Sequence, residues 1–374
     1  MLLADSELLA RLIAFDTTSA NSNVEMADFI AGYLDRPGVH IERVFDESNE
    51  KLNLLVHCGP PSDERSGLVL SGHMDVVPAR EAGWRSDPFT MTEHGDRFVG
   101  RGTADMKGFL ALAMNATARL DPAGLRAPLV LLLTYDEEVG CLGAKRFVDE
   151  FRDPARLPVS AIIGEPTSLE VVRMHKGHLK LRVVTRGIAA HSGYPHLGEN
   201  AIEKAAGAVQ SLAAIRRELE GERSEFSDFF PEVPFVSLNV GTIRGGAAIN
   251  VVPDRCEFEV GIRLLPGMQS ADIVQRVRRS VPEGEVEVIS DSPPLLLDPG
   301  AQVHQAVSAL VNQTGTRTVS FAADAGWLQN LGLECILFGP GSIEVAHRPN
   351  EFIPKDELHR GAVLIDQIIA QYCG

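Results

Sequence analysis

Histidine and carboxylate side chains recur in short polar segments, most of which directly follow an apolar run. A charged group at the end of a buried strand is expensive unless a counter-charge compensates it. Imidazole and carboxylate ligands, without thiolate, suit a hard to borderline divalent cation such as zinc, cobalt or manganese. Two neighbouring cations need a shared carboxylate and further ligands on each side. The chain supplies a sufficient set of residues for this: His73, Asp105, Glu138, Glu165 and His347.

Each of these residues also has an ordinary structural interpretation. An isolated histidine after a strand is more often hydrogen-bonded than metal-bound. Asp105 is of the type that caps a helix beginning at Met106, and the pair Glu137 and Glu138 is compatible with simple solvation. The joint pattern, in which acidic segments follow apolar runs and two histidines accompany them, favours one shared site.

The elements that must position these residues alternate between strands and helices. Up to about residue 177, apolar runs predict buried strands, and amphipathic stretches at 107–120 and 142–152 predict helices. This alternation predicts an α/β sheet covered on both faces, with ligand groups in loops at the strand ends. The predicted strands are residues 52–58, 68–70, 128–134 and 159–163.

The pattern changes near residue 178 and returns to α/β near residue 291. The intervening order is strand, helix, strand, strand, helix, strand, which is the split βαβ arrangement of a ferredoxin-like α+β domain. We therefore predict a catalytic metal-binding α/β domain from residues 1–177 and 291–374, and an inserted lid or dimerisation domain from 178–290. The small sheet would have an unpaired edge in a monomer, and pairing two such edges predicts a homodimer. The inserted elements are expected at residues 179–185, 200–219, 235–241, 256–263, 271–281 and 286–289.

Composition excludes several classes of protein. A net charge of −16 over 374 residues argues against a nucleic-acid partner, because phosphate binding requires a basic face. No apolar run approaches the roughly 20 residues that cross a bilayer, and the N-terminus lacks the features of a signal peptide. The five cysteines are scattered without a CxxC pair, which is typical of reduced thiols. We predict a cytoplasmic protein that acts on a small molecule and uses no membrane or nucleic acid.

Two long motifs resemble one enzyme family. Residues 73–78 read His-Met-Asp-Val-Val-Pro, and residues 100–108 read Gly-Arg-Gly-Thr-Ala-Asp-Met-Lys-Gly. With Trp84 and residues 87–89 between them, they resemble the dinuclear zinc aminoacylases and carboxypeptidases, and the similarity runs through nearly the whole chain. The resemblance implies a zinc-peptidase-like catalytic domain with a ferredoxin-like lid, two bound divalent ions, and hydrolysis of the amide of an N-acyl amino acid.

The resemblance also implies a role for each site residue. Asp105 would bridge the two ions, with His73 and Glu165 on one side and Glu138 and His347 on the other. Glu137 would be the general base, because a glutamate beside an activated water can take its proton. Asp75 would hold His73 in its ligating tautomer.

The inserted domain contributes three more candidates by the same resemblance. His191 would reach the site of the other subunit and donate to the oxyanion; its alternative interpretation is an exposed turn histidine. Asn250 and Arg263 would grip the substrate carboxylate, which suits the planar fork of an arginine. A surface salt bridge is the alternative for Arg263.

Residues 339–351 resemble the branch of the family that deacetylates N-acetylornithine. A desuccinylase of succinyl-diaminopimelate, a deacylase of acetylcitrulline or another acyl amino acid, and an inactive binding protein on the same fold are the alternatives. One segment departs from the deacetylase pattern: in residues 321–326, Asp324 stands where a glutamate is usual. This departure leaves open which amino-acid side chain is bound.

Overall fold

The computed structural model describes residues 2–62 and 64–374, which form two compact units. Unit 1 comprises Met1–Arg173, Leu297–Arg317 and Ala323–Gly374, and unit 2 comprises Met174–Leu296 and Thr318–Ala322. The boundaries expected at residues 178 and 290 fall inside two strands, β9 (Gly177–Arg186) and β14 (Gly284–Ser292). Both strands lie wholly within unit 2, whose main segment runs from Met174 to Leu296.

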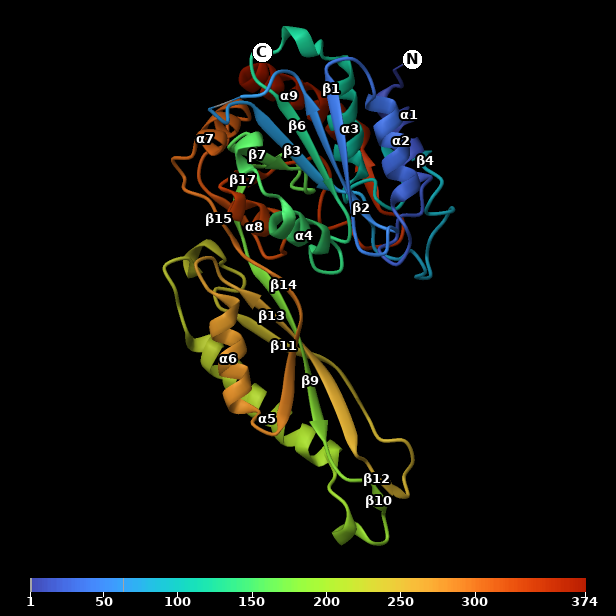
Figure 1. The fold of residues 1–374 in the computed structure, drawn as a ribbon, viewed down its shortest axis with the longest axis vertical. Coiled ribbons are helices and arrows are strands. Elements are labelled where there is room, and N and C mark those ends of the chain that lie inside the picture. The colour runs from blue at the N-terminus through green and yellow to red at the C-terminus, as the bar shows by residue number, and fades with distance from the viewer. Residues whose placement is uncertain (1, 63) are drawn as a thin grey trace. The chain divides into compact units, whose positions relative to one another are not determined.

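Unit 1 is built on a mixed sheet in the order β1-β2-β6-β3-β7-β17, with β8 beside β17 (Figure 1). The inner strands β6, β3, β7 and β17 run parallel, whereas β1 and β2 are antiparallel additions at one edge. Consecutive buried residues along the inner strands explain their apolar runs, since both faces are covered. The strands are β1 (Val39–Phe45), β2 (Leu52–Cys58), β3 (Leu68–His73), β6 (Leu129–Thr134), β7 (Ser160–Ile163), β8 (Val172–His175) and β17 (Glu334–Leu337). The predicted α/β class is confirmed.

Helices complete the core of unit 1. The apolar stripe of α1 (Asp5–Ile13) is fully buried, and α3 (Lys107–Arg119) packs against both α1 and α9 (Lys355–Cys373). These helices, with α2 (Val24–Leu34) and α7 (Gln302–Leu310), share one apolar cluster with alternate residues of the strands. The short helix α8 (Ala325–Leu328) contacts α4 (Leu142–Glu150) and β17. In the described part of the chain, no helix combines the length and apolar character that crossing a membrane requires. A small three-stranded sheet contains β4 (Thr92–His94), β5 (Arg97–Val99) and β18 (Phe352–Pro354).

Unit 2 contains a four-stranded antiparallel sheet in the order β11-β13-β9-β14, covered on one face by α5 and α6 (Figure 1). The order along the chain is β9, α5, β11, β13, α6, β14, which is the ferredoxin-like arrangement. Strand β13 alternates buried and partly exposed residues, as expected for a sheet with one solvated face. The remaining bounds are α5 (Ala201–Gly221), β11 (Ser237–Gly245), β13 (Arg255–Leu264) and α6 (Ser270–Ser280).

A two-stranded ladder lies beyond one end of this sheet, where β10 (Ala190–His191) pairs with β12 (Val251–Val252). Helix α5 begins after this ladder with Asn200, whose side chain accepts hydrogen bonds from the amides of Ile202 and Glu203. An asparagine cap of this kind is readable from sequence.

Gly164 governs how closely α3 approaches the sheet. A Cβ at this position would lie 1.9 Å from the ring of Phe109, which is buried in α3. We expect Gly164→Ala to lower the free energy of unfolding by about 1–3 kcal/mol, because overpacking strains a close-packed interior. Urea denaturation measures the change.

Gly32 supplies the matched control within unit 1, because a Cβ there would meet no atom within 4 Å. Gly32→Ala in helix α2 should raise the unfolding free energy by about 0.5–1 kcal/mol through helix propensity. If both alanine variants were equally stable, the absence of a side chain at Gly164 would not be what allows α3 to pack closely against the sheet.

Candidate active site

Three neighbouring parallel strands bring the polar segments together. Strand β3 ends at His73, β6 ends at Thr134 just before the segment 136–138, and β7 ends at Ile163 just before Glu165. Because β6, β3 and β7 are adjacent and parallel, their carboxyl ends meet at one edge of the sheet. The segment from 100 to 106 and the loop that carries His347 complete the group, and all of these residues belong to unit 1.

Asp105 lies between the two histidines. Its Oδ1 is 3.1 Å from His73 Nε2 and its Oδ2 is 3.3 Å from His347 Nε2. His347 Nε2 is also 3.0 Å from Glu138 Oε2. Asp105 does not cap α3, whose N-cap is Met106 without any side-chain cap bond. One carboxylate therefore faces a different imidazole with each of its oxygens.

The two acidic residues after β6 are not a solvated pair. The side chain of Glu138 is only 6% exposed, and burial together with the charge of Asp105 raises its pKa to about 6. Burial likewise raises the pKa of Glu137 well above its usual value. Hydrogen bonds to Asp105 and Glu138 raise the pKa of His347 to about 10.

Asp75 ties the end of β3 to the loop that carries the glutamates. Its carboxylate accepts hydrogen bonds from the amides of Glu137 and Glu138, at 3.0 and 3.3 Å, and from Ser19 Oγ at 2.7 Å. His73 Nδ1 lies 2.9 Å from the backbone oxygen of Asp75 and 3.5 Å from Asp75 Oδ1. Asp75 therefore orients His73 through its backbone as well as its side chain, which leaves Nε2 directed at Asp105.

Glu165 is the clearest sign that the cluster accommodates a cation. The residue is 4% exposed, and its Oε1 has no hydrogen-bond partner among the described residues. Burial and the charge of Asp105 raise its pKa well above the usual value. A buried carboxylate oxygen without a donor is costly. Together with two imidazoles and further carboxylates, this donor set fits divalent cations that accept nitrogen and oxygen ligands.

Asp324 lies close to this cluster rather than at a solvated position. It is 1% exposed, and its Oδ2 accepts a 2.5 Å hydrogen bond from Thr134 Oγ1. Ligand atoms of Asp324, Glu137 and Cys141 lie within 4.8 Å of one another. Burial raises the pKa of Asp324 to about 6.

Sequence reasoning missed the buried pair of Arg101 and Glu351. Glu351 Oε1 accepts hydrogen bonds from the amides of Ala104 and Asp105, and its Oε2 lies 2.7 Å from Arg101. Both side chains are 1% exposed. The pair fixes the backbone that presents Asp105. Both residues stand in segments noticed in the sequence, but nothing local reveals a pairing across about 250 positions.

The candidates from the inserted segment lie in unit 2. His191 is exposed on the β10–β12 ladder, where the amide of Ser192 donates to the carbonyl of Asn250 at 3.0 Å. Arg263 lies near the far end of β13, paired with His178 and Ser237. From Arg255, where β13 begins next to the ladder, to Arg263 the strand extends about 26 Å at ~3.3 Å per residue. Unit 2 thus brings His191 near Asn250 but holds Arg263 at its opposite end.

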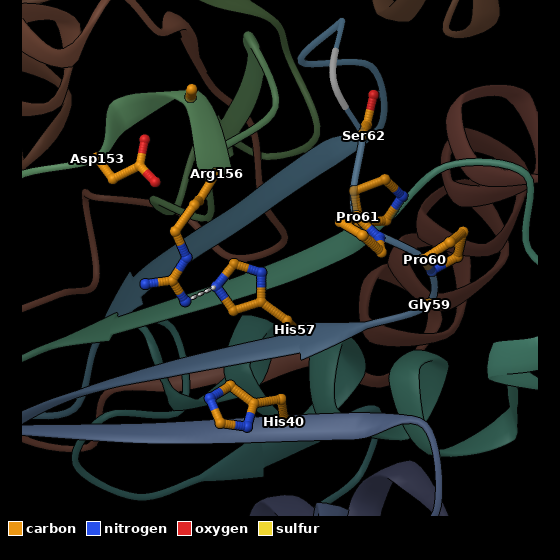
Figure 2. Close-up of a pocket in the computed structure, with 10 residues that line it drawn as sticks. His40, His57, Gly59, Pro60, Pro61, Ser62, Asp153 and Arg156 are labelled. Carbon is orange, nitrogen blue, oxygen red and sulfur yellow. Dashed lines mark hydrogen bonds between the residues drawn. The ribbon is translucent and has the colours of Figure 1, made fainter.

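A separate cavity of about 420 Å³ lies in unit 1 at the outer strands β1 and β2 (Figure 2). Arg156 donates to His57 Nε2 at 3.5 Å and pairs with Glu42. Burial and the charge of Arg156 lower the pKa of His57 to about 4, so this imidazole is neutral near pH 7. The cavity lacks the converging carboxylates of the main cluster. Its lining comprises His40, His57, Gly59, Pro60, Pro61, Ser62, Pro128, Asp153, Ala155 and Arg156.

The sequence and the fold of this chain match those of a known family of hydrolases. The model of peptidase family M20/M25/M40 matches residues 69–371, and the chain belongs to that family. This membership confirms the resemblance found in the motifs. Among curated relatives, the acetylornithine deacetylase of Myxococcus xanthus is 36% identical over 377 residues, which cover 98% of this chain and 97% of that protein.

Solved structures share the fold at lower identity. A metallo-carboxypeptidase of the M20 family from Sulfolobus solfataricus has a TM-score of 0.81 at 18% identity, covering 98% of this chain and 99% of the other. A dinuclear metal-binding peptidase of the same family from Bacillus subtilis has a TM-score of 0.65 at 14% identity, with 98% of each chain covered. At these identities the likeness shows the fold.

The Arg101–Glu351 pair generates a stability prediction. Glu351→Gln should lower the unfolding free energy by about 1.5–3 kcal/mol, because it removes one of the two carboxylates that pair with the buried guanidinium, the other being that of Glu81. Denaturant unfolding followed by circular dichroism measures this change in free energy.

Glu93→Gln is the control for this prediction. Glu93 pairs with Lys355 at the surface, and the glutamate side chain is 64% exposed. That change should cost no more than about 1 kcal/mol. Equal losses in the two variants would mean that the buried pair does not stabilise the Asp105 segment.

Proposed function

We propose that this protein hydrolyses the N-acetyl amide of N2-acetyl-L-ornithine to L-ornithine and acetate, as a step of arginine biosynthesis in the cytoplasm. The geometry that carries the proposal is Asp105, with one oxygen facing His73 and the other facing His347 and Glu138. The curated relative from Myxococcus xanthus, similar over nearly the full length, supports the choice of acetylornithine. The five cysteines, all buried and free in the described part of the chain, are consistent with a reducing compartment.

The buried cluster would hold two divalent cations, zinc or alternatively cobalt or manganese. Asp105 would serve both positions, with His73 and Glu165 at one and Glu138 and His347 at the other. The unpartnered oxygen of Glu165 and the absence of cysteine from this set suit such ions. The solved Bacillus subtilis neighbour is itself described as a dinuclear metal-binding peptidase. When bound, the cations would polarise the amide carbonyl and lower the pKa of a water at the site.

Glu137 would act as the general base. It takes a proton from the attacking water and returns it to the leaving amine, so one carboxyl group serves both halves of the reaction. Burial raises the pKa of its carboxyl above the usual value. Asp75 holds the Glu137 amide, and thereby the loop from which this side chain projects.

The substrate would be held by residues of two chains. Arg263 would bind the α-carboxylate through its planar fork, and Asn250 and His191 would bind the substrate carboxylate and the oxyanion. Because about 26 Å of strand separates Arg263 from the ladder that carries the other two, these three groups do not converge within one unit 2. A homodimer in which His191 and Asn250 act in the partner's site removes this difficulty.

Exposed apolar side chains around the ladder support dimerisation through unit 2. The ladder and its flanking turns expose large apolar residues, as a surface that pairs with a second copy of the chain would. They are Ile188, Tyr194, Leu197, Ile249 and Val251, with exposures from 40% to 101%. We propose that the protein acts on a small-molecule substrate and that it forms a dimer with a second copy of the chain.

The decisive experiment combines a substrate panel with one substitution. Wild-type protein should cleave acetylornithine in preference to acetylcitrulline, acetylmethionine and succinyl-diaminopimelate. Glu137→Gln should lower kcat by about two to four powers of ten through loss of the base, while metal analysis still finds two ions per chain. Steady-state kinetics and elemental analysis give both quantities.

Four results would contradict parts of this assignment. Preference for succinyl-diaminopimelate would identify the alternative desuccinylase, and preference for acetylcitrulline would identify the other deacylase. Loss of metal in Glu137→Gln but not in Glu138→Gln would mean that the two glutamates have exchanged roles. Full activity without metal would remove the proposed mechanism altogether.

Subunit mixing tests the shared site. His191→Ala and Glu137→Gln should each be nearly inactive alone. In a mixed dimer, one site combines an intact Glu137 with the partner's intact histidine, so activity should partly return when subunits exchange. Exchange is verified by native mass spectrometry of differently tagged chains. If exchange occurs and activity stays absent, His191 does not act across the dimer.

A further inference from the structure

Cys141 occupies a backbone position that favours glycine. It follows Gly140 at the end of the loop between β6 and α4, with φ of 54°. The amides of Gly140 and Cys141 both donate to the Glu137 carbonyl at 2.9 Å, which closes the loop tightly. A residue with a Cβ costs about 1–2 kcal/mol in this left-handed region, whereas glycine adopts it freely. The side chain of Cys141 is therefore accommodated at a cost in local backbone strain.

The thiol contacts Glu137. Cys141 is 1% exposed, and its Sγ donates to Glu137 Oε1 at 3.4 Å. Asp324 is close by, since ligand atoms of Glu137, Cys141 and Asp324 all lie within 4.8 Å of one another. Thr134 Oγ1 holds Asp324 through Oδ2 at 2.5 Å. A thiol thus stands beside two buried carboxylates, one of which a hydroxyl fixes in place.

We propose that Cys141, supported by Asp324 and Thr134, is a positioning group that fixes the Glu137 carboxylate for proton transfer. This inference rests on the proposed role of Glu137 as the general base. A glutamate side chain rotates about three bonds, whereas a base must stay within hydrogen-bond reach of the proton that it accepts. Repulsion between the two carboxylates disfavours rotamers of Glu137 that bring it closer to Asp324.

The chemical type of the hydrogen-bond donor affects how readily the Glu137 carboxylate accepts a proton. A cationic donor would stabilise the ionised carboxylate strongly and weaken its basicity. A thiol is a weak donor, so it restrains the orientation of Glu137 while withdrawing little of its affinity for a proton. This combination of restraint and weak donation explains why a cysteine is used at a position where glycine would fit better.

Three substitutions at Cys141 separate positioning from packing. Cys141→Ala and Cys141→Gly both remove the donor and should lower kcat about five- to tenfold with KM unchanged, as expected for a lost hydrogen bond of roughly 1 kcal/mol that orients the base. Cys141→Ser keeps a donor of similar shape and should retain most of kcat. The glycine variant should melt no lower than the alanine variant, because glycine relieves the strain at φ of 54°.

Cys335→Ala is the matched control, because Cys335 is another fully buried thiol of unit 1, in strand β17. It should leave kcat unchanged whatever its effect on melting. Infrared spectroscopy of the S–H stretch gives a readout independent of turnover. The S–H band of Cys141 is the one that is absent from the spectrum of Cys141→Ala. This band should shift in Glu137→Gln, because the acceptor changes from a carboxylate to an amide. It should stay in place in Glu93→Gln.

The outcomes distinguish this inference from the proposed function. If Glu137→Gln loses activity while Cys141→Ala and Cys141→Gly keep wild-type kcat, the positioning role is wrong and the base assignment stands. If Glu137→Gln retains activity, the base assignment itself is wrong. A loss of kcat in Cys141→Ala without a shift of the S–H band in Glu137→Gln would also overturn the proposal, since the thiol would then act elsewhere than on Glu137.

Discussion

The concentration of negative charge at the edge of the unit 1 sheet is the constraint on which the rest of this structure depends. Asp105, Glu138 and Glu165 are brought together where the ends of parallel strands meet. Their mutual repulsion and their removal from water both oppose folding. The two histidines compensate part of this charge, and cations in the proposed sites would compensate much of the remainder.

Residues outside the cluster make this arrangement rigid. Asp75 accepts hydrogen bonds from two loop amides and a serine hydroxyl, so it joins the end of β3 to the loop that follows β6. Glu351 does the same for the Asp105 segment and is itself paired with Arg101. Buried charges of this kind stabilise a structure only while every partner is present. Their value here lies in fixing the direction of side chains that would otherwise adopt several rotamers.

The candidate residues for metal binding, proton transfer and substrate recognition divide between the two units. Unit 1 holds every candidate for binding the cations and for moving protons, on strands buried on both faces. Unit 2 holds the candidates for recognising the substrate, with Arg263 on its four-stranded sheet and His191 and Asn250 at the β10–β12 ladder. The long strands β9 and β13 place polar groups at both ends of that sheet. An extended element of this kind allows one domain to serve two sites when two chains associate.

The sequence by itself determined the element types and the residues of the cluster. Apolar runs and the β-α-β-β-α-β order are local or periodic signals, so they predicted the α/β class and the ferredoxin-like insertion. His73, Asp105, Glu138, Glu165 and His347 were identified because most of their segments follow apolar runs and because the motifs that contain them resemble those of one enzyme family. Tertiary structure alone decided that Asp105 faces both histidines, that Glu351 pairs with Arg101, and that Cys141 contacts Glu137 beside Asp324. Those contacts depend on side-chain direction and on pairings between distant segments, which a linear pattern of residue types does not encode.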